Sequence, residues 1–156
     1  PEGAIIETSP LGTKIMKALA ARIAKTGGAA LVIDYGSDRP GHGDTFQAVR
    51  AHEYSDPLAA PGEADLTAHV DFPALAKAAA EAGAQPRTPM TQSEFLIRLG
   101  LAARAEALAS GKDEATREAI RIAAERLVGK EAMGALFKVF AVSTPGLTLP
   151  AFDQNG

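Results

Sequence analysis

The chain has 156 residues, of which 46% are hydrophobic and 22% charged, with a formal net charge of −3 at pH 7. This composition is ordinary for one globular domain and offers no basic excess for binding nucleic acid. Cysteine is absent and the three histidines are far apart, which excludes disulfides and thiolate zinc sites and predicts no metal site. Since neither a membrane-length apolar run nor a signal-peptide pattern is visible, we expect no membrane span and a cytoplasmic protein.

The first predicted elements are a helix and a buried strand. Ser9 and Pro10 suit a helix start, because the Ser9 hydroxyl can accept hydrogen bonds from free N–H groups and Pro10 has none to satisfy. Apolar residues recur at helical spacing until Gly27-Gly28, which end the helix. The apolar run Ala29–Ile33 then predicts a strand buried on both faces, as in a parallel sheet covered by helices.

The middle of the chain predicts loops, one short strand and one helix. Residues 37–44 are rich in Gly, Asp and Pro and predict a loop, whereas residues 45–50 alternate apolar and polar side chains, as in a half-exposed strand. Residues 54–64 contain two prolines and are predicted to be irregular. Asp71 then caps a helix over residues 72–82.

The last third of the chain is predicted to be mostly helical. After at most a short edge strand within residues 84–90, a helix begins at Thr91 or Ser93, and alanine-rich helices continue to Val128. Residues 136–142 then predict a final strand. Helices that alternate with buried strands indicate an α/β protein, and the alternative is an all-α domain with one apolar loop.

Polar side chains follow the predicted buried strand directly. Asp34, Tyr35 and Gly36 come just after it, and ligands bind outside the carboxyl ends of strands in open parallel sheets. A carboxylate and a phenol there can hydrogen-bond a cationic substrate. The structural alternative is a turn in which Asp34 caps backbone groups.

A second group of polar side chains lies between residues 62 and 71. Asp65, Thr67, His69 and Asp71 share parity, so an extended segment would place them on one face, which suits acid–base chemistry or guanidinium binding. For the first three, local turn hydrogen bonds are an equal alternative. For Asp71 the helix cap is the better interpretation.

Five ordered stretches of the chain resemble the MidA family of S-adenosylmethionine-dependent methyltransferases. Each stretch alone is a weak signal, but five in order at compatible spacing are specific, and the resemblance spans residues 3–142. The family includes the mitochondrial arginine methyltransferase needed for respiratory complex I assembly. The stretches are residues 33–36, 43–50, 62–72, 91–96 and 133–139.

The resemblance implies a C-terminal half of a Rossmann-like, seven-stranded class I methyltransferase sheet, with an inserted helical segment at about residues 91–130. Ala29–Ile33 would be its fifth strand, and residues 136–142 its last, antiparallel strand. The glycine-rich cofactor loop and the ribose-holding acidic residue of the family's first two strands do not occur in residues 1–156. We therefore expect the N-terminal cofactor-binding half to be absent and the fragment alone to be inactive. The strand edge left free beside Ala29–Ile33 predicts self-association into homodimers or larger species.

The implied function is that of a fragment of an S-adenosylmethionine-dependent protein arginine methyltransferase, with a respiratory complex I subunit as substrate. The alternative is a non-catalytic assembly or binding module that keeps the methyltransferase fold. Asp34 and Asp65 are the catalytic candidates, because carboxylates would hold the charged guanidinium and orient its nitrogen. The candidate substrate-binding residues are Tyr35, Gly36, Thr67 and His69.

Overall fold

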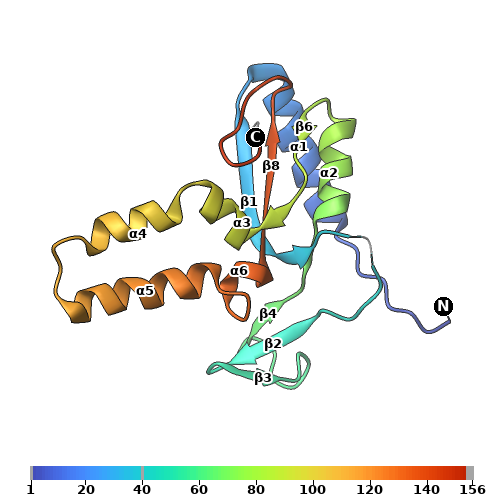
Figure 1. Ribbon diagram of the computed structural model, residues 1–156. Helices are drawn as coiled ribbons and strands as arrows, with labels where there is room; N and C mark the ends of the chain where they lie inside the picture. Colours follow the sequence, from blue (N-terminus) through green and yellow to red (C-terminus); the bar gives the residue numbers. More distant parts are fainter. Residues whose placement is uncertain (1, 40, 154–156) are drawn as a thin grey trace.

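The computed structural model describes residues 2–39 and 41–153, in which helices alternate with strands (Figure 1). The predicted α/β class is confirmed, and the all-α alternative is wrong. In chain order the helices are α1 (Pro10–Thr26), α2 (Phe72–Glu81), α3 (Gln92–Arg98), α4 (Leu101–Ala109), α5 (Glu114–Val128) and α6 (Met133–Leu136). The strands are β1 (Ala29–Ser37), β2 (Gln47–Arg50), β3 (Glu53–Ser55), β4 (Asp65–Thr67), β5 (Val70–Asp71), β6 (Gln85–Pro86), β7 (Met90–Thr91) and β8 (Phe137–Ser143).

The main sheet is built around β1 and β8, which pair antiparallel along the whole length of β8. The short strands β6 and β7 both pair with the other edge of β8, and β5 pairs in parallel with only the last two residues of β1. Among the residues described, the edge of β1 opposite β8 therefore has no strand partner from Ala29 to Tyr35. This is the free edge that the sequence predicted.

Side-chain caps fix where the helices begin, as the sequence predicted. Ser9 and Asp71 each accept a hydrogen bond from a backbone N–H three residues further on, at 3.2 and 3.0 Å. Thr91, rather than Ser93, caps α3 in the same way, and Asp113 caps α5. Each cap satisfies one of the N–H groups that a helix start leaves without a partner.

The core lies between one face of the main sheet and the helices α1 and α2 (Figure 1). The rings of Phe72, at the start of α2, and Phe140, on β8, are fully buried with their centroids 5.9 Å apart. Ala30 and Val32 of β1 pack against the same cluster. The core therefore joins β1, β8 and both helices into one unit.

The prediction that Ala29–Ile33 is buried on both faces is wrong. Leu31 and Ile33 are 51% and 46% exposed, whereas Ala30 and Val32 face the core. Successive side chains of a strand point to opposite faces, and α1 and α2 cover only one of those faces. Burial of a strand thus depends on what packs against each side, which its own apolar run does not specify.

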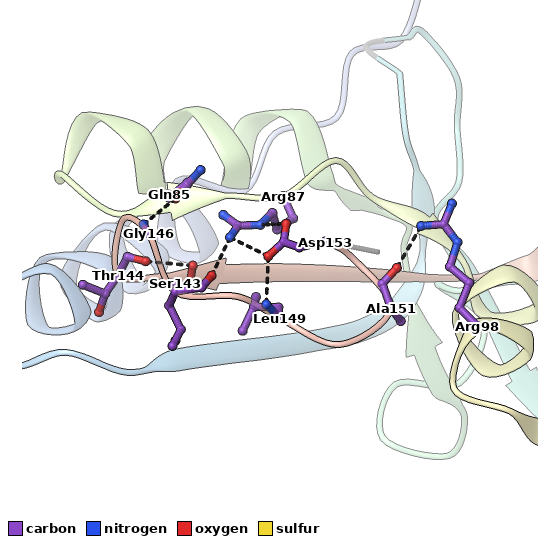
Figure 2. Close-up of polar contacts among 10 residues, drawn as sticks. Gln85, Arg87, Arg98, Ser143, Thr144, Gly146, Leu149, Ala151 and Asp153 are labelled. Carbon is purple, nitrogen blue, oxygen red and sulfur yellow. Dashed lines mark hydrogen bonds and ion pairs between the residues drawn. The ribbon is translucent and has the colours of Figure 1, made fainter. Parts of the chain in front are cut away.

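Residues 144–153 fold back along the main sheet and are held there by Arg87 (Figure 2). Its guanidinium donates two hydrogen bonds to the Asp153 carboxylate, both 2.9 Å, and a third to the Leu147 carbonyl at 2.8 Å. The hydrogen bonds from Arg87 hold the pKa of Asp153 below its ordinary value. Arg98 adds a 2.8 Å hydrogen bond to the Ala151 carbonyl. This arrangement fixes the C-terminal segment against the strands and helix it crosses.

The alanine-rich helical segment predicted at about residues 91–130 comprises α3, α4 and α5. The last two helices run side by side as an arm that projects from the main sheet (Figure 1). No residue of α4 or α5 is buried. Among the helices described, none is both long and apolar enough to cross a membrane.

A second, small sheet lies beyond the carboxyl end of β1, with the strand order β3-β2-β4 (Figure 1). It includes β3, of which Tyr54 and Ser55 fall within the residues 54–64 that the sequence predicted to be irregular. Ala51 and His52 form the turn between β2 and β3 with φ angles of 50° and 67°, a conformation that favours glycine or asparagine in tight hairpins. Two residues link β4 to β5, and β5 pairs with β1, so this hairpin is anchored to the end of the main sheet.

Candidate active site

Asp34 and Tyr35 lie within β1 rather than beyond its end. The strand was predicted to end at Ile33, and that boundary is wrong because pairing continues to Ser37. The Tyr35 ring lies 4.3 Å from that of its cross-strand partner Phe137, measured between centroids, and the last two residues of β1 pair with β5. The two predicted site residues are thus held by regular strand pairing, which positions them more firmly than a loop.

The Asp34 carboxylate is exposed and has no ion-pair partner in the described part of the chain. It accepts a 2.8 Å hydrogen bond from the adjacent N–H of Tyr35. Lys138 is its cross-strand neighbour, but the Lys138 ammonium donates to the Ala135 carbonyl at 2.7 Å. Asp34 therefore retains oxygen lone pairs for a cationic ligand.

Gly36 allows a close approach between three elements. A Cβ atom at this position would lie 2.4 Å from the Val70 carbonyl oxygen and 2.6 Å from the ring of Phe72. Both distances are shorter than packed atoms tolerate, so only glycine lets β5 and the start of α2 lie against β1. Close packing therefore explains why residue 36 is a glycine. The contact of Gly36 with substrate stays a prediction.

Asp65 and Thr67 share one face of β4, but the predicted continuous row from Asp65 to Asp71 is wrong. The strand is interrupted at residues 68–69, where the His69 N–H donates to the Thr45 hydroxyl at 2.9 Å instead of to a strand. Asp71 caps α2, as the sequence indicated. Thr67 and His69 consequently lie at the junction of the two sheets, and Asp65 lies two residues further out on the small sheet.

A hydrogen-bond chain that the sequence analysis did not find holds this junction together. The Glu7 carboxylate accepts hydrogen bonds from the hydroxyl and the N–H of Thr45, and the same hydroxyl accepts the hydrogen bond from His69. The hydroxyl hydrogen bond is the main reason why the pKa of Glu7 lies below its ordinary value. Glu7 and Thr45 are 38 residues apart, so no local sequence signal connects them.

We expect Thr45→Val to raise the pKa of Glu7 and to reduce stability most at neutral pH. A lowered carboxyl pKa adds stability above the pKa of the unfolded state, and that stability is lost as pH falls through the folded-state pKa. The loss of unfolding free energy should therefore shrink below the ordinary pKa of 4.5. An NMR titration of the Glu7 carboxyl carbon and urea unfolding at neutral and acidic pH measure both effects.

Thr13→Val is the matched control, because the Thr13 hydroxyl donates to backbone carbonyls of α1 and not to a carboxylate. Its effect on stability should not depend on the ionisation of Glu7. An unchanged Glu7 pKa in the Thr45 variant would contradict the hydrogen-bond chain.

The candidate site is an open surface. An apolar hollow of about 360 Å³ involves Ala29–Leu31 at the amino end of β1, together with Phe95 and Leu149, and none of the predicted site residues lines it. Within the described ranges, no group of three or more acidic or histidine side chains is arranged to hold a metal ion. The exposed carboxylates of Asp34 and Asp65 lie on either side of the junction of the two sheets, where they can accept hydrogen bonds from a charged group on another molecule.

Comparisons with known proteins agree on one family. A family model described as "Putative S-adenosyl-L-methionine-dependent methyltransferase" matches residues 1–90. Two relatives carry the name "Protein arginine methyltransferase NDUFAF7, mitochondrial". The protein from Danio rerio is 41% identical over 82% of this chain, and the protein from Homo sapiens is 38% identical over 88%. The chain spans 30% and 31% of the length of these two relatives.

Two solved structures of COG1565 superfamily proteins from Burkholderia thailandensis resemble this chain over 95% of its length. One has a TM-score of 0.83 at 29% identity, covering 95% of this chain and 41% of its own. The other, bound to S-adenosyl-homocysteine, has a TM-score of 0.78 at 28% identity, covering 95% of this chain and 40% of its own. Both likenesses are high enough to support common ancestry as well as a common fold.

Proposed function

Since this chain belongs to the family of S-adenosyl-L-methionine-dependent methyltransferases, we propose that the whole protein methylates an arginine side chain of a protein substrate. The observation that carries this proposal is the match to relatives named as protein arginine methyltransferases, at 41% and 38% identity over most of the chain. The exposed carboxylates at the carboxyl end of β1 give the matching chemistry, because arginine stays charged and binds carboxylates well.

In this proposal the chain supplies the acceptor side of the site. S-adenosylmethionine would supply the methyl group, and we propose that residues of the whole protein other than these 156 would bind it. Methyl transfer requires chiefly that the guanidinium nitrogen be positioned in line with the methyl group. Asp34 has the open carboxylate for that task, and Asp65, Thr67 and His69 lie toward the small sheet. The ring of Tyr35 packs on Phe137 of β8, and successive side chains of a strand point to opposite faces, so the ring lies across the sheet from the Asp34 carboxylate.

The resemblance to the MidA family supports a respiratory complex I subunit as the substrate. The whole protein should be incubated with S-adenosylmethionine and purified complex I subunits, and the products analysed by peptide mass spectrometry. We expect one arginine to gain the mass of a methyl group, and a reaction without S-adenosylmethionine is the control. If a subunit is retained by the protein but no arginine is methylated, the protein is a binding module instead.

We also propose that the isolated chain self-associates through the free edge of β1. The edge from Ala29 to Tyr35 has unpaired backbone groups, and Leu31 beside it is 51% exposed. Such an edge is a template for pairing with a second strand. Light scattering should show dimers or larger species that Leu31→Lys dissociates, whereas Leu11→Lys, on the exposed surface of α1, should not. A monomer at every concentration would contradict this proposal.

A further inference from the structure

Negative charge is concentrated in the segment from Asp34 to Asp71. This segment holds eight acidic and two basic residues, a net charge of −6, against −3 for the whole chain. The remaining residues therefore carry a net charge of +3. The segment comprises the end of β1, the small sheet and β5, so the charge asymmetry of the sequence becomes an asymmetry between the two ends of the structure (Figure 1).

One face of the small sheet carries Tyr54, Val49 and Asp65 in a row. Directly opposite residues of antiparallel strands share a face, and Val49 of β2 pairs with Tyr54 on one side and Asp65 on the other. Gln47 and Thr67 form the next row of the same face, toward the end of β1. Tyr54 is 80% exposed, and among the residues described Asp65 has no ion-pair partner.

The chain covers the opposite face of the small sheet only in part. This face carries Ala48, which is fully buried, and Leu66, which is 55% exposed. Arg50, which has the same parity, forms an ion pair of 2.8 Å with Glu63 in the loop before β4. Among the described residues of the small sheet, only the face with Tyr54 and Asp65 combines an exposed aromatic ring with a carboxylate that has no ion-pair partner.

We propose that the Tyr54 face, defined as Tyr54, Val49, Asp65, Gln47 and Thr67, docks a basic, extended segment of the substrate protein next to the arginine that is methylated. This inference rests on the proposed function. A phenol ring stacks on guanidinium groups, and a carboxylate pairs with them. The two outer strands of a three-stranded sheet lie about 10 Å apart, which leaves room for one extended peptide over the middle strand.

The negative charge of the segment favours a basic peptide over a second copy of the chain as the partner of the Tyr54 face. Two copies that met through this face would bring two segments of net charge −6 together, and juxtaposed like charges oppose association. A basic peptide instead gains attraction over the whole segment. Within the Tyr54 face, the row with Thr67 is the one closer to the junction with β1, the strand that carries Asp34.

The test is steady-state kinetics of the whole enzyme with a basic arginine peptide taken from the methylated subunit. Tyr54→Ala should raise the KM for the peptide about five- to tenfold, the effect of removing one well-placed aromatic contact, with kcat nearly unchanged. Tyr54→Phe keeps the ring and should restore most of the affinity. Asp65→Asn should also raise the peptide KM and should weaken its dependence on salt. Ser55→Ala, adjacent to Tyr54 but on the opposite face, is the control and should leave the peptide KM unchanged.

Three results would overturn the inference. An unchanged peptide KM in Tyr54→Ala would show that the peptide does not bind the Tyr54 face. If the melting temperature of this variant also falls, another part of the same protein covers the face. A change in oligomeric state would mean that a second copy covers it. If the wild-type enzyme shows no turnover, the proposed function fails separately, and fluorescence anisotropy with the same peptide still tests docking. Binding that Tyr54→Ala weakens would support the face, and equal binding would reject it.

Discussion

Asp34→Asn in the whole enzyme should lower the rate of methyl transfer by about one to two orders of magnitude. Its carboxylate is exposed, lacks an ion-pair partner among the described residues and lies on a regular strand at the carboxyl end of the sheet. The substitution would leave a cationic guanidinium facing a neutral amide, and a hydrogen bond to a charged group contributes about 1.5–3 kcal/mol. Affinity for S-adenosylmethionine should hardly change. Methyl-transfer kinetics and calorimetric titration of the cofactor on the same variant separate the two effects.

Asp38→Asn is the control. Asp38 directly follows β1, belongs to the same acidic segment as Asp34 and is also exposed. The substitution should leave both the rate and the cofactor affinity unchanged. The structural alternative for Asp34 makes a different prediction, because among the described residues its carboxylate accepts a hydrogen bond only from the neighbouring Tyr35 N–H. A lower melting temperature with an unchanged rate for each folded molecule would remove Asp34 from the site.

Phe72→Ala should reduce the free energy of unfolding by about 3–5 kcal/mol, the range for deleting a buried aromatic side chain. The ring is fully buried, packs 5.9 Å from Phe140 between centroids and lies directly beneath Gly36. Its loss leaves a cavity beneath the end of β1, so site geometry should suffer together with stability. Urea unfolding of the 156-residue chain measures the loss.

Phe46→Ala is the matched control, because Phe46 is 45% exposed and its removal leaves no enclosed cavity. Its effect should stay below about 1 kcal/mol, as for surface substitutions in general. If Phe72→Ala cost no more than Phe46→Ala, the core between the main sheet and α2 would be wrongly placed.

Elements with local signals were predictable from the sequence. Ser9 and Asp71 cap their helices as predicted, because a cap acts within three residues along the chain. The final strand was predicted within one residue at each end. The methyltransferase family predicted from five ordered stretches is confirmed by the family model and by the solved structures. The antiparallel pairing of the last strand followed from that resemblance.

Features that depend on distant residues were not predictable. Leu31 and Ile33 have the apolar character of buried residues, but their exposure depends on which face α1 and α2 cover. The hydrogen bonds from Thr45 to Glu7 join residues 38 positions apart, and no local pattern connects the two. The Tyr54 face could not be predicted from the sequence, because it depends on the register of β2 with β3 and β4. That register aligns Tyr54 with Asp65.

We propose that the arginine to be methylated binds at the carboxyl end of β1. A crystal structure of the whole protein with S-adenosyl-homocysteine and an arginine peptide tests it most directly. We predict a guanidinium nitrogen at hydrogen-bond distance, about 2.7–2.9 Å, from the Asp34 carboxylate, with the peptide crossing Tyr54 and Asp65. A guanidinium bound elsewhere, with another segment of the protein covering Asp34, would show that this end of β1 does not bind the arginine.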